Sequence, residues 1–143
     1  MLLVYPAGMN GHSSARKRLF RAMQASDDGH PTCGASASKL GVREGKDVPV
    51  HGGIVHPGTG GMSVTPDDPA RLPASFRPPS LGGVGKHQVF AIELSALPPE
   101  ALGYRPDPDN PRDHGFVEPA SAVSLDRLQQ DLCGTRWRWK EVS

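Results

Sequence analysis

Val89-Phe90-Ala91-Ile92-Glu93-Leu94 is the stretch that decides the fold, because it is the clearest strand in the chain. A short apolar run that contains Phe and Ile and is bounded by turn-forming residues fits a pleated, largely buried segment. We therefore place it at the centre of a sheet. Shorter runs of the same character predict the other strands, in residues 16–23, 48–55, 62–64 and 115–118.

One helix is predicted near the C-terminus. Ser124 is placed to cap its start, Leu125, Leu128 and Leu132 recur at helical spacing, and Gly134 is placed to end it. Short strands followed by a single clear helix predict an α+β domain with few short helices.

The length of 143 residues suits one domain. Residues 1–15 show no apolar period and are predicted to form a mobile leader, so that the domain spans residues 16–143. The chain holds 17 Gly and 15 Pro, which long helices and central strands do not tolerate, so the fold should be rich in loops. Residues 67–85 carry many of them, and a loop of that length is a candidate active-site lid.

The charge balance predicts no general attraction to nucleic acid or to anionic lipid, because 16 Lys and Arg face 15 Asp and Glu for a net charge of +1. Cys33 and Cys133 are too few for a disulfide scaffold or a four-ligand zinc site, and they favour a reducing compartment. The histidines match no compact zinc pattern, so no metal is expected. No stretch has the length of a membrane span or a secretory signal, and a cytoplasmic protein is predicted.

Three short segments carry the chemistry. They are Leu19-Phe20-Arg21-Ala22-Met23, the turn Gly58-Thr59-Gly60-Gly61-Met62-Ser63-Val64, and Phe116-Val117-Glu118-Pro119. The guanidinium of Arg21 offers a planar fork of donors for phosphate oxygens, and the glycines let the backbone before Ser63 approach a ligand closely. The carboxylate of Glu118 suits the stabilisation of a developing positive charge.

The order Arg, Ser, Glu resembles that of ADP-ribosyltransferases. The amino-acid sequences of the segments most resemble those of a family of small bacterial ADP-ribosyltransferase-like toxins delivered by type VI secretion. In that family, a Leu-aromatic-Arg-Ala strand and a Gly-Gly-x-Ser-Val turn recur. The likeness spans about residues 19–118. It implies a split, strand-rich core that binds NAD as a substrate in a cleft between two small sheets, and an immunity protein that plugs this cleft.

The resemblance also implies roles for individual residues. Arg21, Ser63 and Glu118 would be catalytic: Arg21 holding the ribose and phosphate, Ser63 orienting the ribose and the carboxylate, and Glu118 stabilising the oxocarbenium-like transition state. Residues that contact NAD would be Arg21, Gly60, Gly61, Ser63 and Arg77. One departure matters, because Phe116 stands where many arginine-modifying members carry a second Glu or Gln. Modification of arginine is therefore disfavoured, and the acceptor stays open, as does hydrolysis of NAD.

Simpler interpretations of the same residues remain. Arg21 could be a surface residue beside Arg18, Ser63 part of a tight turn, and Glu118 a solvated strand end. The chain could then be a non-catalytic protein that binds a partner protein or nucleic acid. A relative of the RNA 2'-phosphotransferases is a third alternative, for which His114, His56 and Arg77 are candidates.

The sequence Arg136-Trp137-Arg138-Trp139-Lys140 alternates cations with aromatic rings. Read as a strand, it places both Trp side chains on one face. We predict that this face packs into the core, and the alternative is a strip on which bases stack.

Overall fold

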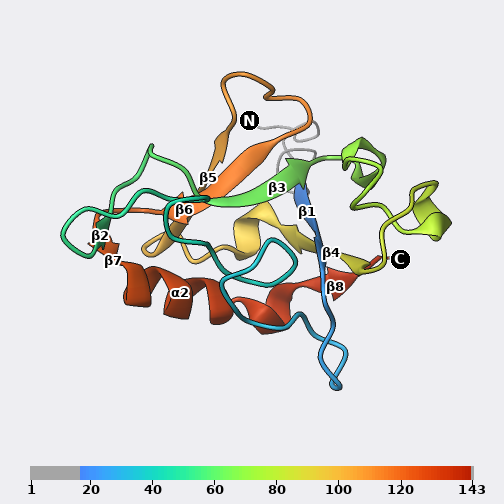
Figure 1. Ribbon diagram of the computed structural model, residues 1–143, viewed down its shortest axis with the longest axis horizontal. Helices are drawn as coiled ribbons and strands as arrows, with labels where there is room; N and C mark the ends of the chain where they lie inside the picture. The colour runs from blue at the N-terminus through green and yellow to red at the C-terminus, as the bar shows by residue number, and fades with distance from the viewer. Residues whose placement is uncertain (1–16, 143) are drawn as a thin grey trace, which may run out of the picture.

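The computed structural model describes residues 17–142 and contains eight strands in two sheets and one α-helix. The strands are β1 (Arg18–Met23), β2 (Ile54–Val55), β3 (Met62–Pro66), β4 (Gln88–Glu93), β5 (Leu102–Pro106), β6 (Gly115–Pro119), β7 (Val123–Ser124) and β8 (Lys140–Glu141). The helix α2 spans Leu125–Cys133. The larger sheet has the order β5-β6-β3-β1-β4-β8 with antiparallel neighbours, and β2 pairs with β7 (Figure 1). The predicted α+β class and single domain are confirmed at this level.

The sheet is buried on both faces where β1 and β4 pair. Leu19 and Met23 of β1 lie in the main core, which also contains Leu128 and Leu132 of α2. Phe20 of β1 lies in a second apolar cluster on the opposite face. Burial on both faces explains why the strands lack polar alternation. The strand predicted at the centre, β4, is paired on both sides but lies one position from the sheet edge, because only the two-residue β8 follows it.

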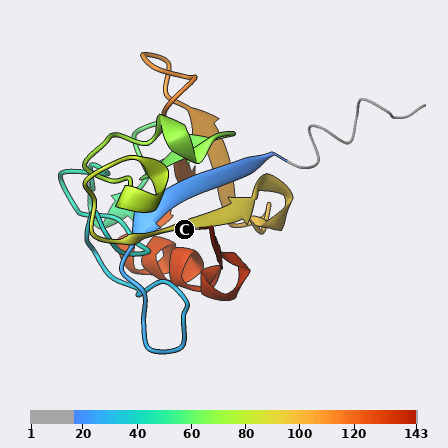
Figure 2. The same ribbon diagram turned by 90° about the vertical axis from the view of Figure 1, so that its right-hand side faces the viewer.

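The predicted helix is confirmed together with its start. The Ser124 hydroxyl accepts a hydrogen bond from the Arg127 backbone N–H at 3.1 Å, as expected of an N-cap residue. Gly134 follows the last helical residue, and its N–H donates to the Gln130 carbonyl at 2.8 Å. The helix lies along one side of the sheet (Figures 1 and 2).

The prediction for the C-terminal Trp pair is half wrong. Residues Arg136–Arg138 form a 3₁₀ turn instead of a strand, and only Lys140–Glu141 pairs with β4. Trp139 is 1% exposed in the core, whereas Trp137 is 60% exposed. A 3₁₀ turn advances about three residues per turn, so residues two apart point in different directions. The stacking strip, which needs both rings on one exposed face, is therefore absent from this arrangement.

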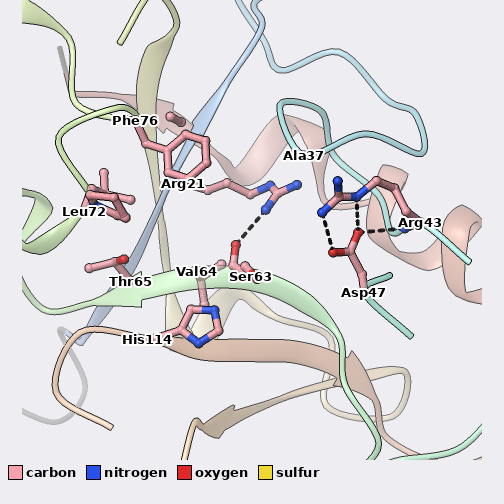
Figure 3. Close-up of a pocket in the computed structure, with 12 residues that line it drawn as sticks. Arg21, Ala37, Arg43, Asp47, Ser63, Val64, Thr65, Leu72, Phe76 and His114 are labelled. Atoms are coloured by element: carbon pink, nitrogen blue, oxygen red, sulfur yellow. Dashed lines mark hydrogen bonds and ion pairs between the residues drawn. The ribbon is translucent and has the colours of Figure 1, made fainter. Parts of the chain in front are cut away.

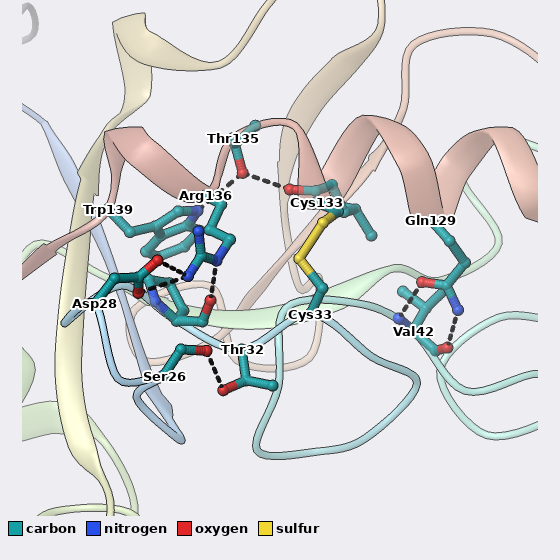
Figure 4. The surroundings of a disulfide bond; sticks show 12 residues. Ser26, Asp28, Thr32, Cys33, Val42, Gln129, Cys133, Thr135, Arg136 and Trp139 are labelled. Atoms are coloured by element: carbon teal, nitrogen blue, oxygen red, sulfur yellow. Dashed lines mark hydrogen bonds and ion pairs between the residues drawn. A yellow bond between two sulfur atoms is a disulfide. The ribbon is translucent and has the colours of Figure 1, made fainter.

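Cys33 and Cys133 form one disulfide with a Cα–Cα distance of 5.5 Å, which was not predicted from the sequence (Figure 4). The bond joins the loop after β1 to the end of α2, across 100 residues of sequence. Two cysteines far apart in the sequence gave no sign that the fold brings them together. Their pairing removes the ground on which a reducing compartment is predicted.

Strand β5 is not among the strands predicted from the sequence. The segment 67–85 contains two 3₁₀ turns, Pro69–Arg71 and Pro79–Leu81, and no strand. The leader predicted for residues 1–15 lies outside the described residues. Within residues 17–142, no helix has the length and apolar character to cross a membrane.

Candidate functional site

The two strands in the middle of the larger sheet, β1 and β3, pair over a short length. β1 and β3 pair only at Leu19 with Pro66 and at Phe20 with Thr65, although both strands continue beyond these pairs. The six strands of the larger sheet thus form one continuous sheet, and not the two small sheets that were expected to flank a cleft. Its two halves, β5-β6-β3 and β1-β4-β8, separate beyond these two residue pairs, and we call this separation the parting. Arg21 reaches across the parting, and its Nη1 donates to the Ser63 carbonyl at 2.7 Å.

Arg21 is a buried residue held by backbone carbonyls, and not a surface side chain. It is 6% exposed. Its Nε and Nη2 donate to the Lys39 carbonyl at 3.2 and 2.8 Å, and Nη2 also donates to the Ser36 carbonyl at 3.1 Å. Burial lowers the pKa of Arg21 to about 10, so the side chain remains charged at neutral pH. Nη1 carries two hydrogens and makes one hydrogen bond within the described residues, which leaves one donor for a ligand.

A cavity of about 270 Å³ lies at the parting (Figure 3). Its walls combine cations, carboxylate, hydroxyls, a histidine and apolar side chains: Arg21, Ala22, Ala37, Arg43, Asp47, Ser63, Val64, Thr65, Leu72, Pro73, Phe76 and His114. The predicted lid, residues 67–85, supplies Leu72, Pro73 and Phe76 and thus forms one wall. Phe76 is 44% exposed, so this wall presents an aromatic ring at the surface.

Arg43 and Asp47 form a rigid ion pair in the cavity wall. Arg43 donates from Nε and Nη2 to the two carboxylate oxygens of Asp47, at 3.0 and 2.9 Å. Burial tends to raise the pKa of Asp47, but the hydrogen bonds from Arg43 outweigh it and the pKa is lowered. The sequence carried no signal for this pair, because only the folded loop places it beside Arg21.

His114 also faces the cavity and is oriented by Asp107. The distance between His114 Nδ1 and Asp107 Oδ2 is 2.8 Å, and this hydrogen bond lowers the pKa of Asp107. The pairing leaves Nε2 of His114 for another partner. Of the residues named for the phosphotransferase alternative, His114 lines the cavity, whereas His56 and Arg77 do not.

The glycine turn packs against the protein itself. Gly60 has a φ of 151°, and a Cβ there would collide with the Asp47 carbonyl; a Cβ on Gly61 would lie 2.6 Å from the Val117 carbonyl. The sequence predicted that these glycines let a ligand approach the backbone closely. In this structure the groups that approach them closely are backbone carbonyls of the protein itself. Ser63 lines the cavity, opposite Phe116 in the pairing of β3 with β6.

Glu118 lies on β6 and is not among the residues that line the cavity. Its Oε1 accepts hydrogen bonds from the Gly58 N–H at 2.8 Å and from Arg105 Nε at 3.0 Å. The glycine turn therefore contacts the predicted catalytic carboxylate through its first residue. Glu118, Phe116 and Ser63 share one face of the sheet, because alternate residues of a strand and directly paired residues point the same way.

Arg77 lies apart from the cavity walls. Its Nε and Nη1 donate to the carbonyls of Leu72 and Leu81 at 2.9 and 2.8 Å, which ties the segment 67–85 together. Within residues 17–142, no group of three or more His, Cys, Asp or Glu side chains is arranged to hold a metal ion.

Replacing Arg21 with Lys should lower the free energy of unfolding by about 2 kcal/mol. An ammonium group cannot reach three carbonyls from one position, and a buried carbonyl left without a partner costs about 1 to 3 kcal/mol. Arg18→Lys on the same strand is the matched control, since Arg18 is exposed, and should change stability by less than about 0.5 kcal/mol. Equal urea midpoints for the two variants would show that the carbonyl contacts do not stabilise the fold.

No protein-family model, no curated protein and no solved structure matches the chain.

Proposed function

We propose that this chain is an NAD-dependent ADP-ribosyltransferase or NAD glycohydrolase that acts as an antibacterial toxin. The observation that supports this proposal is that Arg21, Ser63 and Glu118 lie on the three neighbouring strands β1, β3 and β6. Arg21 and Ser63 line the cavity that lies where β1 and β3 separate.

The cavity supports binding of an anionic ligand with a flat ring. The free Nη1 donor of Arg21 is suited to a phosphate oxygen, and Phe76 offers a ring against which a base can pack. Ser63 lines this cavity and is on the same face of the sheet as Glu118. A dinucleotide could therefore lie with its phosphates in the cavity and its nicotinamide ribose toward Glu118.

The reaction would break the bond between the anomeric carbon of this ribose and the nicotinamide nitrogen. The bonding electron pair leaves with nicotinamide, and the ribose gains positive charge at the anomeric carbon. The Glu118 carboxylate would stabilise that charge as it develops. The lone pair of a water molecule or of an acceptor then bonds to the same carbon, and the attacking group gives its proton to solvent.

Release of nicotinamide from NAD by the purified protein tests the proposal. Glu118→Gln keeps the size of the side chain and removes its charge, and we expect it to lower kcat by about 10²- to 10³-fold. Glu44→Gln, at an exposed carboxylate that is not among the cavity-lining residues, is the matched control and should leave kcat unchanged. A folded Glu118→Gln variant as active as the wild type would contradict the role of Glu118.

The role as a toxin has its own test. Expression of the chain in the cytoplasm of a bacterium should arrest growth, and Glu118→Gln should relieve the arrest. The proposed partner is an immunity protein that covers the cavity, whose co-expression should restore growth. Growth that is unaffected by the active enzyme would remove the toxin role and leave the enzymatic one to the nicotinamide assay.

A further inference from the structure

We propose that Arg105 is the residue that positions Glu118 for catalysis, so that the β5–β6 pair carries the orienting group. The inference rests on the proposed function, because it assigns a partner to the carboxylate on which that function depends. Arg105 does not line the cavity and is not expected to touch the dinucleotide.

Arg105 and the glycine turn hold the same oxygen of Glu118. Arg105 Nε lies 3.0 Å from Glu118 Oε1, and the Gly58 N–H donates to that oxygen at 2.8 Å. Oε2 accepts no hydrogen bond from the described residues. The carboxylate thus has one oxygen fixed by the protein, while the other is left for a substrate hydroxyl.

Arg105 is itself held in place by Phe116. The two residues are paired across β5 and β6, and the guanidinium carbon lies 4.7 Å from the centroid of the Phe116 ring. Packing of a guanidinium over an aromatic face is favourable and fixes the direction of the side chain. The Phe116 ring also makes a T-shaped contact with the His114 ring, with 4.8 Å between the ring centroids, and this contact further restricts it.

The burial of the pair makes this contact more than a surface ion pair. The side chains of Arg105 and Glu118 are 28% and 14% exposed, whereas those of Arg127 and Asp131 on α2 are 63% and 17% exposed, so the two pairs differ mainly in the burial of the arginine. Phe116 stands where many arginine-modifying transferases carry a second Glu or Gln. In this chain that position supports Arg105, so the orienting group comes from the neighbouring strand.

The test uses Arg105→Ala and Arg105→Lys in the full chain, with NAD as substrate and nicotinamide release as the readout. Arg105→Ala should lower kcat by about 10²-fold, because a displacement of about 1 Å at a reacting group has an effect of that size. KM for NAD should change less than about threefold, since Arg105 leaves the substrate untouched. Free guanidinium ion at millimolar concentration should restore part of kcat in Arg105→Ala, and Arg105→Lys should retain an intermediate kcat. Arg127→Ala removes a more exposed Arg–carboxylate pair that does not include Glu118, and it should behave like the wild type.

Two results would overturn the inference alone: an Arg105→Ala kcat within twofold of an active, Glu118-dependent wild type, or a loss of activity that guanidinium does not restore. If Arg105→Ala does not fold, Arg105→Lys is used in its place. A kcat of Arg105→Lys equal to that of the wild type would also overturn the inference. A wild type that releases no nicotinamide would overturn the proposed function first, and the role of Arg105 with it.

Discussion

Replacement of Trp139 with Ala is expected to lower the free energy of unfolding by about 3 to 5 kcal/mol, the usual cost of removing a large buried aromatic side chain. Trp139 is 1% exposed and lies in the main core with residues of β1, β4 and α2. Its indole N–H donates to the Thr135 hydroxyl at 2.9 Å, and that hydroxyl donates to the Leu132 carbonyl at 2.7 Å. The truncation would therefore create a cavity and leave a buried hydroxyl without its donor. Urea unfolding monitored by circular dichroism measures the change.

Trp137→Ala is the matched control, because it removes the same side chain two residues earlier. Trp137 is 60% exposed. The centroid of its ring lies 4.7 Å from the guanidinium carbon of Arg136 and 4.6 Å from the centroid of the His30 ring. Contacts of this kind at exposed sites contribute about 1 kcal/mol or less. Equal losses of stability in the two variants would contradict the arrangement of the C-terminal segment, and in particular its 3₁₀ turn.

The sequence predicted those elements whose signals are local. The helix was found because Ser124, the leucine spacing and Gly134 agree, and β3, β4 and β6 because short apolar runs are bounded by turn residues. The 3₁₀ turn at residues 136–138 was missed because alternation of cations and aromatics over five residues suits a strand equally well. Local patterns therefore predicted the helix and several of the strands, whereas β5 and the 3₁₀ turn could not be predicted from them.

The candidate site was predictable only in part for the same reason. Arg21 and Ser63 were found from short segments, and the fold brings both to the cavity. Arg43, Asp47 and Arg105 were missed, because nothing in their own neighbourhoods distinguishes them from ordinary surface charges. The positions of these three residues in the site depend on which strands and loops become neighbours in the folded chain, and local sequence does not determine this.

Reduction of the disulfide is expected to lower the free energy of unfolding by about 4 to 5 kcal/mol, because the bond closes a loop of 100 residues and so restricts the unfolded chain strongly. Cys33→Ser and Cys133→Ser should each produce this loss, and the double variant should lose little more, since either change already removes the bond. Urea unfolding of the three variants and of the reduced wild type measures it. Additive losses in the double variant would mean that the two cysteines stabilise the fold separately, without a bond between them.

The disulfide should also anchor part of the candidate site, because the segment that follows Cys33 holds Arg21. The Gly34 N–H donates to the Leu40 carbonyl at 3.1 Å, which closes residues 34–40 into a loop that begins at the disulfide. That loop carries the Ser36 and Lys39 carbonyls that hold the Arg21 guanidinium. Hydrogen exchange of residues 34–40 should therefore quicken on reduction under conditions where the sheet stays folded, because the loop loses its covalent attachment to α2 while β1, β3 and β4 keep their pairing. Unchanged exchange there would show that the carbonyls hold Arg21 without help from the disulfide, and that its contribution is confined to the unfolded chain.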